Sequence, residues 1–340
     1  MSKLNKPQII NAFSSLGEYL RQPDEQLINI INAEKSYNAW FTVANINRAI
    51  KALAEELTPA HLEKWLSNYN VPTASPKKVG LILAGNIPLV GFHDVLCVLV
   101  SGHFAMIKAS SQDSHLIRRI LEELVTIEPA FKDQFIFTEK LENFEAVIAT
   151  GSNNTSRYFE YYFGKVPNII RKNRNSIAVL TGSETEGQLY ALGHDIFDYF
   201  GLGCRNVSKV LVPKDYDFTF FFESIQPWYV IADHIKYTNN YDYNKSIYLV
   251  NREKHFDNGF LLLKEDERWV SPLAVLFYQY YDSLSDVETL INGEADKIQC
   301  VVSAADLKVQ PQLVDFGMSQ QPGLADYADG VDTLQFLSNL

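Results

Sequence analysis

Apolar and polar residues follow a helical rhythm in the first part of the chain. Over residues 8–70, apolar side chains recur at intervals of three or four positions, which predicts amphipathic helices. This spacing is seen at Ile9, Phe13, Leu16 and Leu20 and again at Ile50, Leu53 and Leu57. Thr58 followed by Pro59 is typical of a helix N-cap and the first helical position. We therefore expect residues 1–74 to form a helical N-terminal region.

From residue 75 onwards the rhythm changes to short apolar runs separated by helical patterns. In the first half of the chain these runs are residues 79–84, 104–108, 134–137 and 146–149. Buried strands that alternate with helices are typical of a doubly wound α/β sheet, whose ligands bind beyond the carboxyl ends of the strands. Polar residues follow three of these ends: Asn86, then Lys108 and Ser110, then the loop 150–155. We expect a binding site at this edge of the sheet.

The second half of the chain shows the same alternation. Its strand-like runs are residues 176–180, 207–212, 273–280 and 298–303, with a helical pattern at residues 287–291. We therefore expect a second α/β lobe. Two lobes also suit the length, because 340 residues exceed most single domains.

One cysteine has a sequence context that suggests chemistry. Cys204 follows Gly201 and Gly203, whose missing side chains let a ligand or another backbone come close. The apolar run 207–212 begins soon after it, so the pattern predicts a loop that presents a cysteine just before a strand. Such a cysteine can act as a nucleophile, although most free cysteines are small buried hydrophobes.

Charge and cysteine content narrow the possible functions. The chain has 30 basic and 41 acidic residues and a net charge of −11, which argues against binding nucleic acid or an anionic membrane surface. Cys97, Cys204 and Cys300 are far apart, so neither a disulfide framework nor a zinc site is expected, and Cys97 and Cys300 are interpreted as packing residues. The histidines are spaced too irregularly to predict another metal site. With no signal-like start and no apolar run of membrane-spanning length, we expect a cytoplasmic protein.

A dinucleotide site is not obvious from the sequence. The Gly-x-Gly-x-x-Gly fingerprint is absent. Gly151 and Ser152, at the start of a predicted helix, are a possible substitute, because backbone N–H groups at a helix N-terminus can hold a pyrophosphate. Small polar residues cap many helices, so this pair alone is a weak indication.

Several motifs occur in the order in which they occur in one enzyme superfamily. They are Asn-Ile-Pro-Leu at residues 86–89, Ser-Gly-His-Phe-Ala-Met-Ile-Lys-Ala-Ser-Ser at 101–111, Ala-Thr-Gly-Ser at 149–152, Gly-Leu-Gly-Cys at 201–204, Ser-Pro-Leu-Ala-Val-Leu at 271–276 and Phe-Gly at 316–317. The chain resembles the aldehyde dehydrogenases, and more closely their acyl-CoA reductase (LuxC-like) branch. The resemblance covers residues 75–335 and depends on the common order of the motifs.

The resemblance implies a fold and a nucleophile. It implies an NADP-binding α/β domain over residues 75–180, a catalytic α/β domain over residues 181–318, and a tail over residues 319–340 that packs back on the cofactor lobe. Cys204 would form an acyl-enzyme. The side-chain amide of Asn86 and the backbone N–H of Cys204 would hold the oxyanion.

The resemblance also implies a cofactor site and a preference. Its residues are Lys108, Ser110, Ser111, Gly151, Ser152 and Glu267. NAD-preferring members carry an acidic residue three positions after the strand-end lysine, where this chain has Ser111. A serine does not repel a 2′-phosphate, so we expect NADP(H). Glu267 lies close to the position of the glutamate that contacts the nicotinamide ribose, without a clean match in register.

One departure from the superfamily points to the direction of the reaction. Acid-forming members carry their general base in a Glu-Leu-Gly-Gly-Lys segment, whereas the corresponding residues 169–176 here contain no carboxylate. Without a base to activate water, a thioester on Cys204 would survive hydrolysis. The sequence thus predicts NADPH-dependent reduction of a long-chain fatty acyl thioester, acyl-CoA or acyl-protein, to the fatty aldehyde.

Other functions and partners remain open. The chain could be an aldehyde dehydrogenase that works oxidatively, either acylating or acid-forming, or a non-catalytic subunit of an acyl-activating complex. Arg205 and Lys209 could favour the Cys204 thiolate, or they could be solvated surface charges. We also expect a homo-oligomer and a partner protein that activates or transfers acyl groups.

Overall fold

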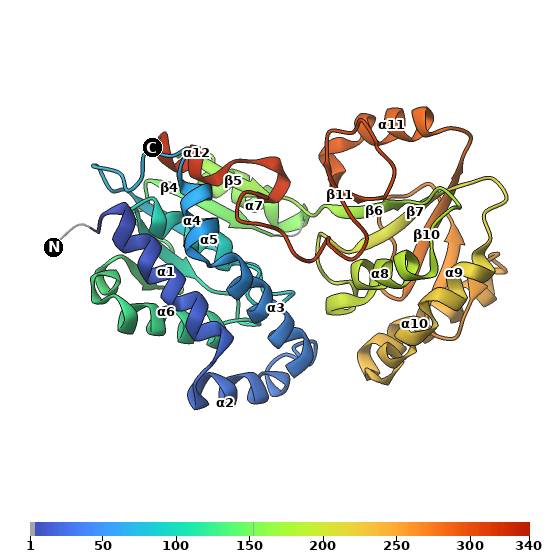
Figure 1. Cartoon of the computed structure of the whole chain (residues 1–340), viewed down its shortest axis with the longest axis horizontal. Helices are drawn as coiled ribbons and strands as arrows, with labels where there is room; N and C mark the ends of the chain where they lie inside the picture. The colour runs from blue at the N-terminus through green and yellow to red at the C-terminus, as the bar shows by residue number, and fades with distance from the viewer. Residues whose placement is uncertain (1–3, 152) are drawn as a thin grey trace. The chain divides into compact units, whose positions relative to one another are not determined.

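The computed structural model describes residues 4–151 and 153–340, which divide into two compact units (Figure 1). Unit 1 runs to Asn173 and resumes over Gly323–Leu340, whereas unit 2 is the continuous segment Arg174–Pro322. Each unit contains a mainly parallel sheet flanked by helices. The two α/β lobes predicted from the sequence are confirmed.

The N-terminal region of unit 1 is helical. Its elements are α1 (Lys6–Arg21), α2 (Glu25–Ala33), η1 (Glu34–Ser36), α3 (Val43–Glu56) and α4 (Pro59–Leu66). Helix α4 begins as its sequence predicts, because the Thr58 side chain accepts a hydrogen bond from the backbone N–H of His61 and Pro59 takes the first helical position. The apolar faces of these helices enter the same core as the sheet that follows.

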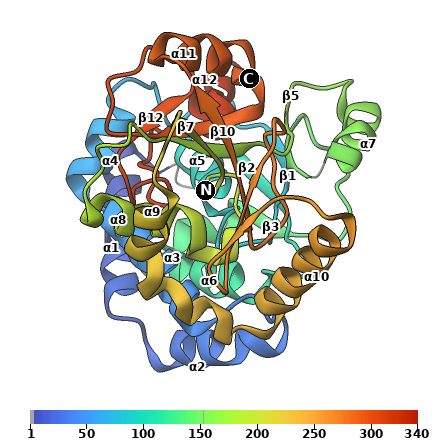
Figure 2. The same cartoon turned by 90° about the vertical axis from the view of Figure 1, so that its right-hand side faces the viewer.

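The sheet of unit 1 is parallel throughout, in the order β3-β2-β1-β4-β5. Its strands are β1 (Lys78–Ile82), β2 (Phe104–Lys108), β3 (Phe135–Phe137), β4 (Ala146–Thr150) and β5 (Asn168–Arg171). The connecting helices are α5 (Phe92–Val100), α6 (His115–Ile127), η2 (Pro129–Asp133) and α7 (Asn153–Phe163), the last beside β5 in Figure 2. In the register Ile82 pairs with both Lys108 and Ala149, so the carboxyl ends of β1, β2 and β4 lie at one edge.

The sheet of unit 2 has the order β12-β11-β6-β7-β10-β9-β8 and is parallel except for the pair β8 and β9. Its strands are β6 (Asn175–Val179), β7 (Val207–Pro213), β8 (Phe256–Asp257), β9 (Leu262–Glu265), β10 (Val275–Tyr281), β11 (Ile298–Val302) and β12 (Gln312–Val314). Its helices are α8 (Glu186–Phe197), η3 (Asp198–Gly201), α9 (Phe218–Ile225), η4 (Gln226–Asp233), α10 (Ile235–Asn251), α11 (Leu284–Gly293) and η5 (Ala295–Lys297). Because β6 pairs with β7 and β11, unit 2 begins at Arg174, close to the run 176–180 seen in the sequence and ahead of the boundary at residue 180 that the resemblance implied.

The segment after residue 322 packs onto unit 1. It contains η6 (Ala328–Gly330) and α12 (Thr333–Ser338), and α12 lies against α5 (Figure 1). His103 fixes this contact, because its Nδ1 accepts the backbone N–H of Lys77 (2.9 Å) while its Nε2 donates to the carbonyl of Leu337 (2.9 Å). Burial lowers the pKa of His103, which keeps the ring neutral in the one tautomer that satisfies both bonds.

A buried ion pair joins three segments of unit 1. Arg171 at the end of β5 pairs with Asp94 on α5, and both side chains are less than a tenth exposed. The same guanidinium donates to the hydroxyl of Thr333 on α12 (3.0 Å). These contacts account for the burial of a charged residue at the end of β5.

The described part of the chain contains neither a helix that could span a membrane nor a cluster of metal-ligating side chains. No helix there is both long and apolar enough to cross a lipid bilayer. The same residues contain no group of three or more His, Cys, Asp or Glu side chains that could hold a metal ion.

The ion pair generates a stability prediction. Arg171→Met leaves the Asp94 carboxylate buried without its partner, which typically destabilises a fold by about 3–5 kcal/mol. Faster hydrogen exchange of the α5 and α12 amides, measured by mass spectrometry, should report the loss. The control is Lys140→Met, whose pair with Glu142 is fully solvated and should have little effect. Equal exchange in the two variants would show that the buried pair is not needed.

Candidate active site

Cys204 lies on a loop with a strained backbone. The preceding residues Tyr199, Phe200 and Gly201 have φ angles of 53°, 59° and 78°, so three consecutive residues are left-handed. Glycine adopts this conformation freely, whereas each aromatic residue needs support from its surroundings. The chain thereby reverses sharply between α8 and β7, with Cys204 half-buried on the far side of the turn.

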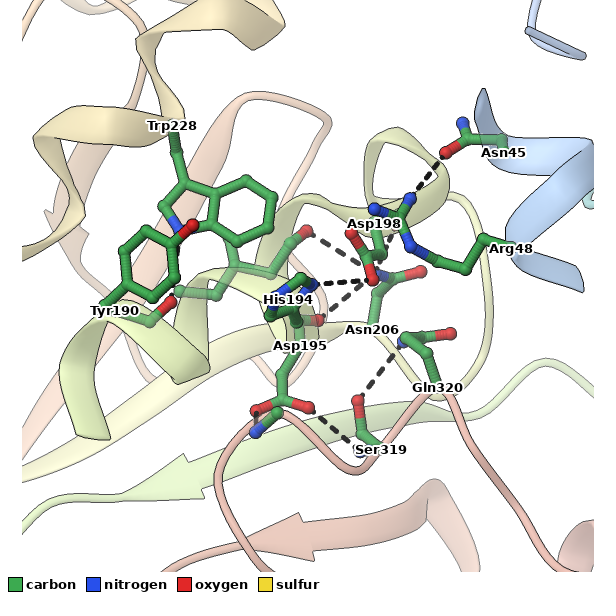
Figure 3. Close-up of polar contacts among 12 residues, drawn as sticks. Asn45, Arg48, Tyr190, His194, Asp195, Asp198, Asn206, Trp228, Ser319 and Gln320 are labelled. Atoms are coloured by element: carbon green, nitrogen blue, oxygen red, sulfur yellow. Dashed lines mark hydrogen bonds and ion pairs between the residues drawn. The ribbon is translucent and has the colours of Figure 1, made fainter. Parts of the chain in front are cut away.

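The side-chain amide of Asn206 supplies that support (Figure 3). Its Oδ1 accepts the backbone N–H of Gly203 (2.8 Å), and its Nδ2 donates to the carbonyls of Asp198 (2.8 Å) and Asp195 (3.1 Å). Asn206 is only 2% exposed, so these bonds are shielded from water. One amide therefore ties the end of α8 to the residue immediately before the cysteine.

The peptide of Cys204 is held from a neighbouring strand. Ser176, fully buried on β6, donates its hydroxyl to the carbonyl of Cys204 (3.1 Å) and accepts the backbone N–H of Cys300 (3.2 Å). The carbonyl of Cys204 is thus fixed on one side. Cys97 and Cys300 are both fully buried, and burial raises the pKa of the Cys97 thiol well above its ordinary value.

The two cations near Cys204 in sequence are both engaged elsewhere. Arg205 donates to the carbonyl of Ser319 and to Oε1 of Gln312 (2.9 Å). Lys209 is fully buried, and its Nζ donates to the carbonyl of Glu267 (2.9 Å) and to Oε1 of Gln279 (2.6 Å). The interpretation of Lys209 as a solvated surface charge is therefore wrong, because its side chain is buried and its ammonium donates to protein groups.

The end of α8 also anchors the Phe-Gly motif at residues 316–317. The buried Asp195 carboxylate accepts the backbone N–H groups of Gly317 (2.6 Å) and Ser319 (2.9 Å), as Figure 3 shows for Ser319. Burial raises the pKa of Asp195 although both N–H donors oppose the shift. Asp198, the residue after α8, binds His194 within the helix (3.1 Å). The indole of Trp228 packs edge-on against the imidazole of His194.

In unit 1, the loops after β1 and β2 lie against each other. A Cβ on Gly85 would fall 2.5 Å from the hydroxyl of Ser110, so this approach requires glycine. The Asp113 carboxylate accepts the backbone N–H of Leu89 (2.6 Å), whose φ is 59°. These contacts bring Asn86, half-buried between Gly85 and Leu89, to the same edge as the loop of Ser110.

Lys108 and Ser111 are exposed on this edge. Lys108 ends β2, and Ser111 follows it by three positions in the loop that Asp113 closes. No carboxylate stands at residues 108–112, and Asp113 is nearly fully buried behind the loop. The exposed groups here are therefore an ammonium and hydroxyls, a donor set that suits a phosphate.

Asp113 is a residue that the sequence reasoning missed. Burial raises its pKa to about 7, the charge of Glu34 adds to the effect, and its second carboxylate oxygen accepts no hydrogen bond from the described residues. In the sequence it stands in a polar loop before a helix, where aspartate is usually a solvated cap. Its burial depends on the approach of the loop after β1, which no local pattern records.

The remaining predicted residues lie in both units. Gly151 follows β4 ahead of α7, and a Cβ there would fall 2.8 Å from the ring of Phe159, so the helix packs directly on this position. Ser152 lies outside the described residues. Glu267 follows β9 in unit 2 with an exposed side chain, while its carbonyl binds Lys209. Unit 1 therefore gathers Asn86 and the phosphate-type donors, and unit 2 carries Cys204 and Glu267.

Solved structures similar to this chain are aldehyde dehydrogenases and related enzymes. Aldehyde dehydrogenase 21 from Physcomitrella patens has a TM-score of 0.68 at 11% identity, covering 99% of this chain and 84% of its own. An NADP-dependent enzyme from E. coli has a TM-score of 0.68 at 12% identity, with 92% and 78% covered. An NAD-dependent benzaldehyde dehydrogenase from Corynebacterium glutamicum has 0.66 at 13% identity, with 92% and 81% covered. The fold is that of an aldehyde dehydrogenase.

The sequence itself gives the narrower family. Residues 14–192, more than half of the chain, match the family of acyl-CoA reductases (LuxC). The chain belongs to this family and is an oxidoreductase of the aldehyde dehydrogenase superfamily, as the motifs indicated. The matched segment contains Asn86 and Lys108 but ends before Cys204. No curated protein matches the sequence.

The Asn206 contacts generate a prediction. Asn206→Asp keeps the shape but turns a carboxylate oxygen towards backbone carbonyls, and the lost bonds should cost about 1–3 kcal/mol in the free energy of unfolding. A protonated aspartic acid can donate again, so the deficit should shrink as the pH falls. Thermal unfolding at pH 5 and pH 8 measures both effects.

The control for this prediction is Asn240→Asp on α10, where the amide donates to only one carbonyl, that of Lys236, at the surface. It should change the unfolding temperature little at either pH. A deficit in Asn206→Asp that is no larger than in the control, or that does not depend on pH, would contradict the role of the amide.

Proposed function

We propose that this chain reduces a fatty acyl thioester, acyl-CoA or acyl-protein, to the aldehyde with NADPH, through an acyl-enzyme on Cys204. The observation that carries the proposal is the loop of Cys204. Of the three cysteines it alone is not buried, and it follows a strained turn that Asn206 and Ser176 hold in place. Strain that is supported in this way is typical of functional sites.

The first half of the reaction needs only the protein and the thioester. The Cys204 thiolate attacks the acyl carbonyl, the bond to the leaving thiol breaks, and that thiolate takes up a proton. The side-chain amide of Asn86 and the backbone N–H of Cys204 stabilise the oxyanion, and such a donor contributes about 3 kcal/mol to lowering the barrier. The products are the acyl-enzyme and the free thiol.

NADPH, when bound, supplies the hydride for the second half. Addition of hydride to the acyl carbon would give the alkoxide of a thiohemiacetal on Cys204 and leave NADP+, and breaking of the C–S bond would then release the aldehyde and regenerate the thiolate. Lys108, Ser110, Ser111 and the backbone at Gly151 would bind the phosphates and ribose of the cofactor. The exposed ammonium of Lys108 and the absence of a carboxylate at Ser111 favour the 2′-phosphate of NADPH.

Whether the acyl-enzyme is reduced or hydrolysed depends on whether a base can activate a water molecule to attack it. Residues 169–176, which correspond to the general-base segment of acid-forming relatives, contain no carboxylate. Arg171 is committed to Asp94, and Ser176 to the carbonyl of Cys204. None of the side chains of this segment is a carboxylate that could take a proton from water, which supports a thioester that persists until it is reduced.

The structural similarity to aldehyde dehydrogenases favours one alternative, oxidation of an aldehyde. Incubation with aldehyde and NADP or NAD, with and without CoA, distinguishes the two directions and the acylating from the acid-forming reaction. Absence of turnover in both directions would favour a non-catalytic subunit of an acyl-activating complex. A partner protein that supplies the acyl group and a homo-oligomeric state remain predictions.

The nucleophile can be tested without cofactor. Intact-protein mass spectrometry after incubation with acyl-CoA of increasing chain length should show one covalent acyl group on the wild type and none on Cys204→Ala. Cys97→Ala and Cys300→Ala are matched controls and should acylate normally, since both thiols are buried. Acylation that persists in Cys204→Ala would exclude the mechanism.

The cofactor preference can be tested at Ser111. A carboxylate in Ser111→Glu would repel the 2′-phosphate and accept hydrogen bonds from ribose hydroxyls, so NADPH should bind roughly tenfold more weakly while NADH is spared. Lys108→Ala should also weaken NADPH more than NADH. Fluorescence titrations with both nucleotides measure the affinity ratio. A wild type that prefers NADH, or a ratio unchanged in Ser111→Glu, would refute the preference.

A further inference from the structure

Lys209 is a fully buried lysine on the strand that follows the Cys204 loop. Its ammonium donates to the carbonyl of Glu267 (2.9 Å) and to Oε1 of Gln279 (2.6 Å), and it lies 4.8 Å from the centre of the Trp269 ring. Among the described residues it makes no ion pair, since Asp266 is taken by Lys264 and Arg268. The amine therefore binds neutral acceptors on two neighbouring segments.

A second contact joins the same strand to the same segment. Ser208 donates its hydroxyl to the carbonyl of Trp269 (2.8 Å), so consecutive residues of β7 hold residues 267 and 269. Within the segment, Asp266 accepts from the backbone N–H of Arg268 (3.0 Å) and from its guanidinium (2.6 and 2.8 Å). The backbone on either side of Glu267 is thus fixed, while its side chain is exposed.

Burial of a lysine side chain at this position is energetically unfavourable. Burial lowers the pKa of Lys209 to about 8 against the attraction of Asp266 and Glu267, which shows that the surroundings disfavour the charged form. A methionine would occupy a similar volume and pack on Trp269 without taking a charge out of water. It could not, however, donate from β7 to the carbonyl of Glu267 as the lysine does.

We propose that Lys209 is a positioning residue, which fixes the Glu267 backbone and thereby the orientation of the Glu267 carboxylate towards the ribose of the nicotinamide cofactor. This inference rests on the proposed function, in which Glu267 contacts the cofactor. Lys209 then acts in the reductive half of the reaction and has no part in acylation of Cys204. Both of its hydrogen bonds accordingly go to groups outside the Cys204 loop.

The test separates the two halves of the reaction. In Lys209→Met, acylation of Cys204 by acyl-CoA without NADPH should proceed at the wild-type rate. NADPH, titrated by its fluorescence, should bind about tenfold more weakly, and hydride transfer to the preformed acyl-enzyme should slow by roughly tenfold to a hundredfold. The matched control is Lys245→Met in the same unit, which contacts Tyr241 and Asp257 and should leave all three quantities unchanged.

A double-mutant cycle tests whether Lys209 acts through Glu267. If it does, Glu267→Ala should weaken NADPH binding, and adding Lys209→Met should weaken it little further. If Lys209→Met does not fold, Ser208→Ala releases the same segment without changing a charge and should shift NADPH affinity in the same direction. Unchanged affinity in the folded variant, or additive effects in the cycle, would overturn the proposal. A wild type that does not acylate would instead refute the proposed function.

Discussion

The loop that carries Cys204 depends on one buried side-chain amide, that of Asn206. This amide accepts the N–H of Gly203, which follows the left-handed turn, and donates to the carbonyls of Asp195 and Asp198, which precede it, so all three polar groups are satisfied together. Contacts of neighbouring residues extend this arrangement to residues 317–319. Asp195, whose carbonyl meets the amide, holds Gly317 and Ser319 with its carboxylate, and Arg205 binds the carbonyl of Ser319 from the other side. The nucleophile loop and the residues near 319 are therefore one hydrogen-bonded body.

Each unit holds its own predicted site residues by contacts within that unit. In unit 1, the contact of Gly85 with Ser110 and the bond from Leu89 to Asp113 set the loops after β1 and β2 against each other. In unit 2, a strand that starts just after the cysteine holds the segment of Glu267 through Lys209. The predicted site residues of the two units thus depend on separate sets of buried polar groups, and such groups are unfavourable to bury unless they are paired.

How far the sequence predicts this structure depends on the range of the contacts involved. The strands at residues 104–108 and 207–212 and the N-cap at Thr58 follow from local pattern, and they form where expected. The loop of Cys204 was recognisable from its glycines. The burial of Lys209 and Asp113 could not be predicted in this way. A single charged residue in an alternating strand or a polar loop is normally expected to face the solvent. Both are buried by segments distant in the sequence, which periodicity does not record.

The return of the chain to unit 1 has a consequence for its biosynthesis. Unit 2 is continuous, whereas unit 1 needs α12, whose Thr333 and Leu337 bind Arg171 and His103. A ribosome that makes 5–20 residues per second reaches Thr333 roughly ten to thirty seconds after finishing Asn173. During that interval unit 2 can fold, but the apolar surface of α5 that later receives α12 stays uncovered on the nascent chain. Unit 1, most of which is made before unit 2, is therefore completed after it, and it is the unit that would need protection from aggregation.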